Sequence, residues 1–233
     1  KVLRTCDNHT IYKTGAKEIA ARHGQALTFM AKYDEREGNS CHIHLSLRGT
    51  DGDIVFADDD RDGGRSELFD SFLAGVLATM REFSYFYAPN INSYKRFAAG
   101  SFAPTAVAWG TDNRTCSLRV VGHGAGLRVE NRVPGGDVNP YLAVAAMLAG
   151  GLHGIREGLA LEPACVGNAY VGDYEHVPST LAQARDLLAG SAIAREAFGD
   201  EVVDHYVNAA DVELAAFNSA VTDWERVRGF ERL

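Results

Sequence analysis

Two histidines lie two positions apart in the segment CHIHLSL, residues 41–47. Apolar and polar residues alternate there, which predicts a β-strand with His42, His44 and Ser46 on one face. Two imidazoles on one strand face can hold a metal ion, or a metal ion and a phosphate group together. Two ordinary surface histidines would give the same pattern, so the spacing alone leaves both interpretations open.

The segment LRVENRV, residues 127–133, shows a second charged face. The same alternation places Arg128, Glu130 and Arg132 on one side of a strand. Glu130 could be a carboxylate ligand of a metal ion, flanked by guanidinium groups that neutralise a carboxylate or a phosphate. The alternative is that these three charged side chains have no binding role and form the solvent-exposed face of a strand.

Further arginines gather nearby, in a chain whose formal net charge is −8. Arg96 lies in NSYKR, and Arg114 and Arg119 precede the charged strand. Guanidinium groups suit bidentate binding of phosphate and carboxylate, which predicts a pocket for a nucleotide or another polyanion. The glycine-rich phosphate loops GxxxxGK[ST] and GxGxxG are missing, and GHGAG at 122–126 is interpreted as a hairpin connection. The combination favours metal-assisted phosphoryl transfer from a nucleotide.

These side chains need a sheet and helices to position them. Alternation and short apolar runs predict strands at 27–31, 41–47, 54–56, 105–110, 115–121 and 126–133. Helical periodicity predicts helices at 12–24, 65–88, 140–158, 179–189, 192–197, 201–209 and 211–227. Ser66 and Asn139 are the expected N-caps, and Pro140 stands at a first helical position. The order of elements predicts an α+β fold with a largely antiparallel sheet flanked by helices.

Composition narrows the class of protein. The 233 residues are 46% hydrophobic and 23% charged, as in ordinary globular domains. No apolar run is long enough for a membrane helix, and no basic stretch could follow a nucleic acid backbone. The four cysteines form no CxxC pair, which favours a reducing, cytoplasmic environment. The first residue is Lys rather than Met, so we expect further sequence upstream.

The spaced motifs of this chain resemble those of the glutamine synthetase family, in its C-terminal catalytic domain, over nearly the whole length. The motifs are CDNHTIYK at 6–13, FMAK at 29–32, GNSCHIHLSL at 38–47, NSYKR at 92–96, RVENR at 128–132 and NPYL at 139–142. The resemblance implies that the sheet is part of the family's catalytic barrel. It also implies a homo-oligomer of stacked hexameric rings. The N-terminal β-grasp domain and the first metal-binding strands would then lie outside residues 1–233, and this chain alone would be inactive.

The resemblance also implies residue roles. His42 and Glu130 would be ligands of a divalent metal, Mg²⁺ or Mn²⁺. ATP would be a co-substrate, and four residues would contact it: His44, Ser46, Arg114 and Arg119.

Substrate roles follow from the same motifs. Gly38, Arg96 and Arg132 would bind glutamate and the transferred phosphate, with Arg96 and Arg119 acting in catalysis. The family makes γ-glutamyl phosphate from ATP and glutamate, and an amine then displaces the phosphate.

One departure from the family pattern bears on the amine. Phe102 stands where the family has a glutamate that closes over the ammonium site. A phenyl ring neither accepts a proton nor pairs with ammonium, so a larger primary amine is expected, as in the γ-glutamyl-amine ligases of polyamine or ethanolamine use. The hairpin at 120–127 is also shorter and lacks the family's ATP-contacting lysine. Tyr170 lies where some bacterial members are adenylylated, but its surroundings differ and it is interpreted as a surface tyrosine.

Three alternatives stay open. The protein could be a true glutamine synthetase that uses ammonia, or a non-catalytic paralogue that binds nucleotide or glutamate. It could also be an unrelated metalloprotein with an HxH motif, which would bind metal without any dependence on ATP.

Overall fold

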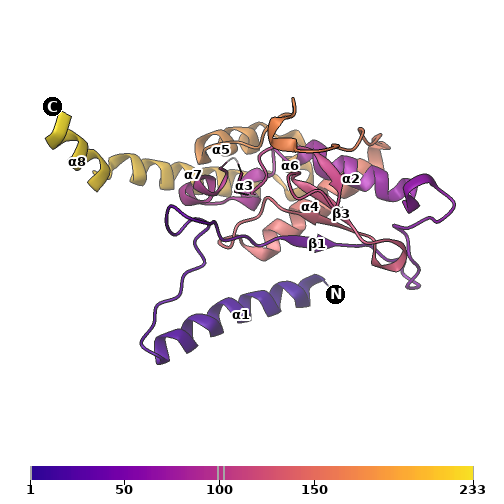
Figure 1. Ribbon diagram of the computed structural model, residues 1–233, viewed down its shortest axis with the longest axis horizontal. Helices are drawn as coiled ribbons and strands as arrows, with labels where there is room; N and C mark the ends of the chain where they lie inside the picture. Colours follow the sequence, from indigo (N-terminus) through magenta and orange to yellow (C-terminus); the bar gives the residue numbers. More distant parts are fainter. Residues whose placement is uncertain (1, 99, 102, 233) are drawn as a thin grey trace.

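The computed structural model describes residues 2–98, 100–101 and 103–232, and it shows one small sheet flanked by helices (Figure 1). The strands are β1 (Ile43–Leu45), β2 (Trp109–Thr111), β3 (Leu118–Val121) and β4 (Arg128–Asn131). Their spatial order is β1-β4-β3-β2. β4 pairs antiparallel with both β1 and β3, whereas β2 runs parallel to β3. The α+β class is confirmed, with a mixed sheet in which two of three pairings are antiparallel.

Helices make up most of the remaining structure. They are α1 (Val2–Arg22), α2 (Glu67–Thr79), α3 (Ser84–Tyr87), α4 (Pro140–Glu157), α5 (Leu181–Gly190), α6 (Ala192–Phe198), α7 (Asp200–Ser219) and α8 (Asp223–Arg232). Short 3₁₀ turns are η1 (Asp62–Gly64), η2 (Ile91–Arg96), η3 (Gly124–Gly126) and η4 (Ala169–Val171). None of the helices in the described part of the chain combines the length and apolar character that a membrane crossing requires.

Both predicted N-caps are confirmed. The Ser66 hydroxyl accepts a hydrogen bond from the Phe69 amide at the start of α2. The Asn139 side chain accepts from the Tyr141 and Leu142 amides at the start of α4, and Pro140 follows at the first helical position. GHGAG is the connection between antiparallel β3 and β4, as predicted.

Several predicted boundaries were wrong. The helix expected at 65–88 is divided between α2 and α3. The backbone tightens between them, since the Met80 amide donates to the Leu77 carbonyl and the Ser84 amide donates to the Arg81 carbonyl. The strand expected at 27–31 is irregular, since this segment links α1 to the rest and has no strand partner among the described residues. Residues 54–56 form only one isolated bridge, between Ile54 and Arg48. The other strands are shorter than predicted, and α1 begins ten residues earlier.

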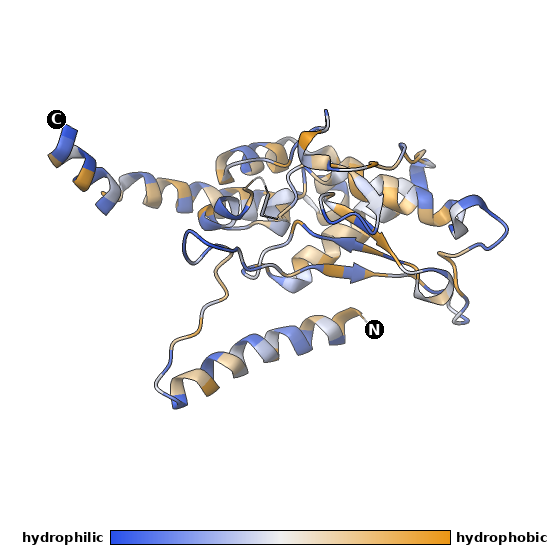
Figure 2. Ribbon diagram, viewed as in Figure 1, coloured by the Kyte–Doolittle hydropathy of each residue, from blue (hydrophilic) through white to orange (hydrophobic). Residues whose placement is uncertain are grey.

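The core lies on one face of the sheet. Strand residues Val120 and Val129 belong to the same buried cluster as Phe72 of α2 and Met147 of α4. Figure 2 shows apolar colour on these central helices and mainly hydrophilic colour on the outer ends of α8. Side chains alternate across a strand, so the opposite face of β3 and β4 is free to carry polar groups.

Glycines allow α2 and α4 to pack closely. A Cβ added to Gly154 would lie 2.6 Å from the Gly75 Cα atom and would overlap the Ser71 carbonyl oxygen. We expect Gly154→Ala to lower the free energy of unfolding by about 1–3 kcal/mol, because the helices must separate to admit the methyl group. Urea unfolding followed by circular dichroism measures this.

The matched control is Gly15→Ala in the middle of α1, where an added Cβ meets no atom within 4 Å. This change should leave stability unchanged or raise it by up to about 1 kcal/mol, since alanine is the better helix former. Equal effects of the two substitutions would contradict the packing argument.

Candidate functional site

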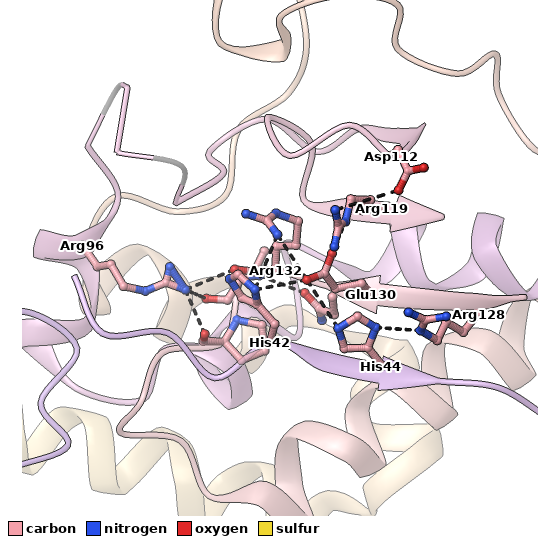
Figure 3. A network of polar contacts seen from close by, with 11 residues as sticks. His42, His44, Arg96, Asp112, Arg119, Arg128, Glu130 and Arg132 are labelled. Carbon is pink, nitrogen blue, oxygen red and sulfur yellow. Dashed lines mark hydrogen bonds and ion pairs between the residues drawn. The ribbon is translucent and has the colours of Figure 1, made fainter. Parts of the chain in front are cut away.

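The strand register aligns three charged or polar side chains across the sheet. His44 of β1 is the partner of Glu130 in β4, and Glu130 is the partner of Arg119 in β3. All three point away from the apolar core, and Figure 3 shows both histidines turned toward Glu130. His42, one residue before β1, lies on the same side.

Glu130 is the centre of this cluster, and only 2% of its surface is exposed. Its Oε1 atom lies 3.1 Å from His42 Nδ1, 3.5 Å from His44 Nε2 and 3.1 Å from Arg132 Nη1. Arg119 Nε donates a hydrogen bond to its Oε2 atom. The structure therefore brings together His42, Glu130, Arg119 and Arg132, which the sequence placed in one site.

Burial by itself would raise the pKa of the Glu130 carboxyl, but hydrogen bonds from His42 and Arg119 and the charges of Arg132 and Arg119 lower it to about 2. The carboxylate is therefore ionised at neutral pH. An ionised carboxylate is an oxygen donor of the kind that binds divalent cations.

This pKa shift predicts a dependence of stability on pH. The folded-state pKa of about 2 lies below the ordinary value of 4.5, so the stabilisation is complete above pH 4.5 and is lost as the pH falls toward 2. We expect the unfolding free energy of the unmodified protein to fall more steeply over this window than that of Glu130→Gln, which has no carboxyl at this position. Urea unfolding at stepped pH values measures the difference. Parallel pH profiles for the two proteins would contradict the assignment.

His44 is oriented by Arg128. Arg128 Nε donates to His44 Nδ1 at 3.1 Å, so the neutral ring carries its hydrogen on Nε2, the atom that faces Glu130. Burial lowers the pKa of His44, the charge of Glu130 opposes this, and Arg128 and Arg119 add to the lowering. Ser46 lies just past the end of β1 at an exposed position.

Arg96 is buried and bound to the chain that follows β4. Its Nη2 atom donates to the carbonyls of Val133 at 2.6 Å, Pro134 at 2.8 Å and Arg132 at 3.2 Å. Burial, the largest effect, lowers the pKa of Arg96 to about 10. Gly38 leaves room for this side chain, because a Cβ there would lie 2.9 Å from Arg96 Cδ.

The structure thus places Gly38, Arg96 and the backbone of Arg132 in contact. The residues that hold the turn carrying Arg96 in place were not predicted from the sequence. Asp137 accepts hydrogen bonds from Ser93 and Asn90, at the start of η2, and so holds the turn that carries Arg96. The capping pattern of Asn90 and Ser93 was the available signal.

Arg114 and Arg119 line a hollow of about 750 Å³ beside the Glu130 cluster. Its other walls are residues 111–113, Thr115 and residues 164–167. Arg119 reaches from Glu130 on one side to Asp112 on the other, with 3.9 Å between Nη1 and Oδ1. Two guanidinium groups in one hollow match the chemistry of a phosphate chain.

The predicted metal ligands supply part of the coordination that a divalent ion needs. His42 and Glu130 offer a nitrogen and an oxygen donor 3.1 Å apart, a mixed set that fits a divalent cation. Within the described residues, no group of three or more His, Cys, Asp or Glu side chains could hold a metal ion. The pair therefore fits as part of a site whose other ligands come from elsewhere. Phe102, predicted at the amine position, lies outside the described residues.

Comparison with known proteins identifies the family. The model of the glutamine synthetase catalytic domain matches residues 1–228. The chain belongs to the glutamine synthetase family. Members of this family generally use ATP and divalent metals, bind glutamate and form oligomers. The resemblance inferred from the motifs is thereby confirmed.

Individual relatives agree with the family assignment. The chain is 64% identical to gamma-glutamylethanolamide synthetase of Streptomyces coelicolor, which it matches over 100% of its own length and 50% of the relative's. It is 44% identical to the glutamate–isopropylamine ligase of a Pseudomonas species, over 97% of this chain and 50% of that protein. The ligand-free structure of GmaS has a TM-score of 0.90 and 31% identity, covering 99% of this chain and 54% of the other. The chain thus spans about half the length of the curated relatives it matches.

Proposed function

We propose that the protein containing this chain is an ATP-dependent ligase that joins glutamate to a primary amine larger than ammonia. The observation that carries the proposal is the Glu130 cluster, in which one buried carboxylate is held by two histidines and two arginines. The relative at 64% identity is named for a γ-glutamylethanolamide product, and the relative at 44% identity is named for isopropylamine as a substrate. Both names support an organic amine as the substrate.

His42 and Glu130 would hold one divalent cation, Mg²⁺ or Mn²⁺, together with ligands from outside the described residues. The ion would neutralise negative charge that develops on the transferred phosphoryl group. The two residues keep their donor atoms close, and Arg119 and Arg132 hold the carboxylate in place.

Two pairs of arginines would bind the other anionic groups of the substrates. Arg114 and Arg119 would bind the phosphates of ATP in their shared hollow, with His44 and Ser46 contacting the nucleotide. Arg96 and Arg132, with Gly38 beside them, would bind glutamate and the transferred phosphate. Arg119 touches both the hollow and Glu130, so it would sit beside the phosphoryl group as it passes to the glutamate carboxylate and forms γ-glutamyl phosphate.

The proposal also concerns the domain organisation and the assembly of the whole protein. The chain would be the C-terminal part of a catalytic domain, and the β-grasp domain and first metal ligands would belong to other parts of the protein. Assembly into stacked hexameric rings and a cytoplasmic location stay predictions. Trp224, Val227 and Phe230 of α8 are exposed, and they offer apolar area to a neighbouring subunit.

The test uses the full-length protein with ATP, glutamate, a divalent cation and a panel of amines that includes ammonium, ethanolamine, isopropylamine and putrescine. Phosphate release and mass spectrometry of the amide report the reaction. We expect the γ-glutamyl amide of an organic amine, and no product after the cation is chelated. Preference for ammonium would indicate a glutamine synthetase. Binding of nucleotide or glutamate without any product would indicate a non-catalytic paralogue.

A further inference from the structure

One carboxylate lies in the hollow that would bind the phosphates of ATP. Among the described residues that line this hollow, Asp112 is the acidic one, beside Arg114 and Arg119. Its Oδ1 atom is 3.9 Å from Arg119 Nη1, and its side chain is 73% exposed. Figure 3 shows it at the outer end of Arg119, away from Glu130. A negative charge there opposes the binding of another anion.

Asp112 contributes charge to the hollow and little to the position of Arg119. The Arg119 Nε atom donates to Glu130 Oε2, and these two side chains are only 15% and 3% exposed. The contact between Arg119 and Asp112 is too long for a hydrogen bond, and an exposed ion pair of this kind holds a side chain weakly. Removal of the Asp112 charge should therefore leave Arg119 in place.

The turn that carries Asp112 is held by bonds that its side chain does not make. The Asp112 amide donates to the Val120 carbonyl at 3.0 Å. The Asn113 side chain accepts from the Thr115 amide at 3.0 Å and donates to the Gly167 carbonyl at 2.8 Å. Asp112 has a φ of 50°, a left-handed conformation that asparagine also adopts. Asp112→Asn should thus remove the charge and keep the turn.

The segment that anchors Asn113 is itself fixed. The Ala169 amide donates to Thr115 Oγ1 at 2.9 Å. Tyr170, the next residue, is half-buried, and its hydroxyl donates to the Ala103 carbonyl at 3.0 Å. The interpretation of Tyr170 as an ordinary surface tyrosine therefore needs correction. Because the turn is held on this side as well, an anion in the hollow stays within reach of the Asp112 charge.

The charges in the hollow favour one form of a nucleotide over another. Arg114 and Arg119 bring two positive charges, but Arg119 already shares its charge with the buried Glu130. Asp112 places a second carboxylate beside the same guanidinium group. Repulsion by this carboxylate grows with the negative charge of the incoming anion. Since a divalent cation cancels two negative charges of a triphosphate, the cation complex is repelled less than the free anion.

We propose that Asp112 is a specificity-determining residue, which weakens the binding of a free nucleoside triphosphate relative to the complex of that nucleotide with a divalent cation. The inference rests on the proposed function and deepens it, because it concerns the form of nucleotide that the same hollow accepts. A site that disfavours the free nucleotide is less often occupied by a form that lacks the cation needed for phosphoryl transfer.

The experiment measures nucleotide binding by the full-length protein without glutamate or amine. Isothermal titration calorimetry with the non-hydrolysable analogue AMP-PNP gives Kd for the free nucleotide in EDTA and for its magnesium complex. In Asp112→Asn we expect Kd for the free analogue to fall about 3- to 10-fold at low ionic strength, the effect of unit charges a few ångströms apart in water. Kd for the magnesium complex should fall about 2-fold or less.

Ionic strength gives a second readout, which a structural defect would not move. The Debye length falls from about 10 Å at about 0.1 M salt to about 3 Å at about 1 M salt. The difference in Kd between Asp112→Asn and the unmodified protein should therefore shrink below about 2-fold at the higher salt concentration. The melting temperature of the two proteins should be the same.

Two variants serve as controls. Asp59→Asn removes the same charge from an exposed position in the loop before η1, outside the hollow, and should leave both Kd values unchanged. Arg114→Gln removes a positive charge from the hollow and should raise both Kd values about 10-fold or more, the effect of a lost hydrogen bond between charged groups.

The outcomes separate the two claims. If the unmodified protein does not bind the analogue, or Arg114→Gln binds it equally well, the hollow is not the nucleotide site. That part of the proposed function is then wrong, and this inference falls with it. If Arg114→Gln binds less well but Asp112→Asn matches the unmodified protein, only the inference is overturned. Weaker binding of the magnesium complex by Asp112→Asn would mean that Asp112 holds the cation or the arginine, and would also overturn it.

Discussion

Replacement of His42 by alanine is expected to lower metal-dependent turnover by about 100- to 1,000-fold and to leave the fold intact. The loss follows from the removal of one proposed metal ligand, since charge neutralisation by a bound cation contributes several kcal/mol to phosphoryl transfer. The fold should survive because the His42 side chain is 26% exposed and lies at the edge of the site, one residue before β1. Phosphate release at saturating ATP and glutamate measures turnover, and circular dichroism reports the fold.

A matched control is His23→Ala, which removes an exposed histidine just after α1. It should leave turnover and its dependence on the cation unchanged. Full activity of His42→Ala at low cation concentration would show that His42 is not a metal ligand.

A comparison of Glu130→Gln with His42→Ala separates the ligand role from the structural role. The change removes the charge that Arg119 and Arg132 share, and a buried ion pair that loses one partner is destabilised by about 3–5 kcal/mol. Turnover and stability should therefore fall together in Glu130→Gln, whereas only turnover falls in His42→Ala. Loss of stability in both variants would assign both side chains to folding.

The second large effect concerns the amine. We expect the unmodified full-length protein to favour a short alkylamine over ammonia by about one to two powers of ten, because two or three methylene groups gain about 0.8 kcal/mol each on burial. The ring of Phe102 can add a cation–π contact of about 0.5–2 kcal/mol. Phe102→Glu should reduce this preference, since a carboxylate pairs with ammonium as well as with an alkylammonium.

The measurement is kcat/KM for ammonium and for a series of primary amines, at matched concentrations of the deprotonated amine. Phe102→Leu is the informative companion variant: it keeps apolar area but removes the aromatic face, so it should retain most of the methylene contribution and lose the cation–π part. A preference for ammonium in the unmodified protein would contradict the role of Phe102 and return the assignment to an ordinary glutamine synthetase.

Much of the site could be predicted from local sequence. The two-residue period of a strand places His42 and His44 on one side and separates Glu130 from Val129, and both arrangements are present in the structure. Caps such as Ser66 and Asn139 were predictable because their hydrogen bonds span only two or three residues. The roles of these side chains in metal and substrate binding stay predictions.

Tertiary structure decided the rest, because the deciding contacts join residues far apart in the chain. Nothing local shows that Arg119 is the register partner of Glu130, that Arg96 donates to the carbonyls after β4, or that Tyr170 reaches Ala103. The apolar run at 27–31 resembles a strand in isolation, yet a strand forms only where a partner edge is present. Local residue patterns indicated which side chains could do chemistry, and the pairing of distant strands brings them together around one buried carboxylate.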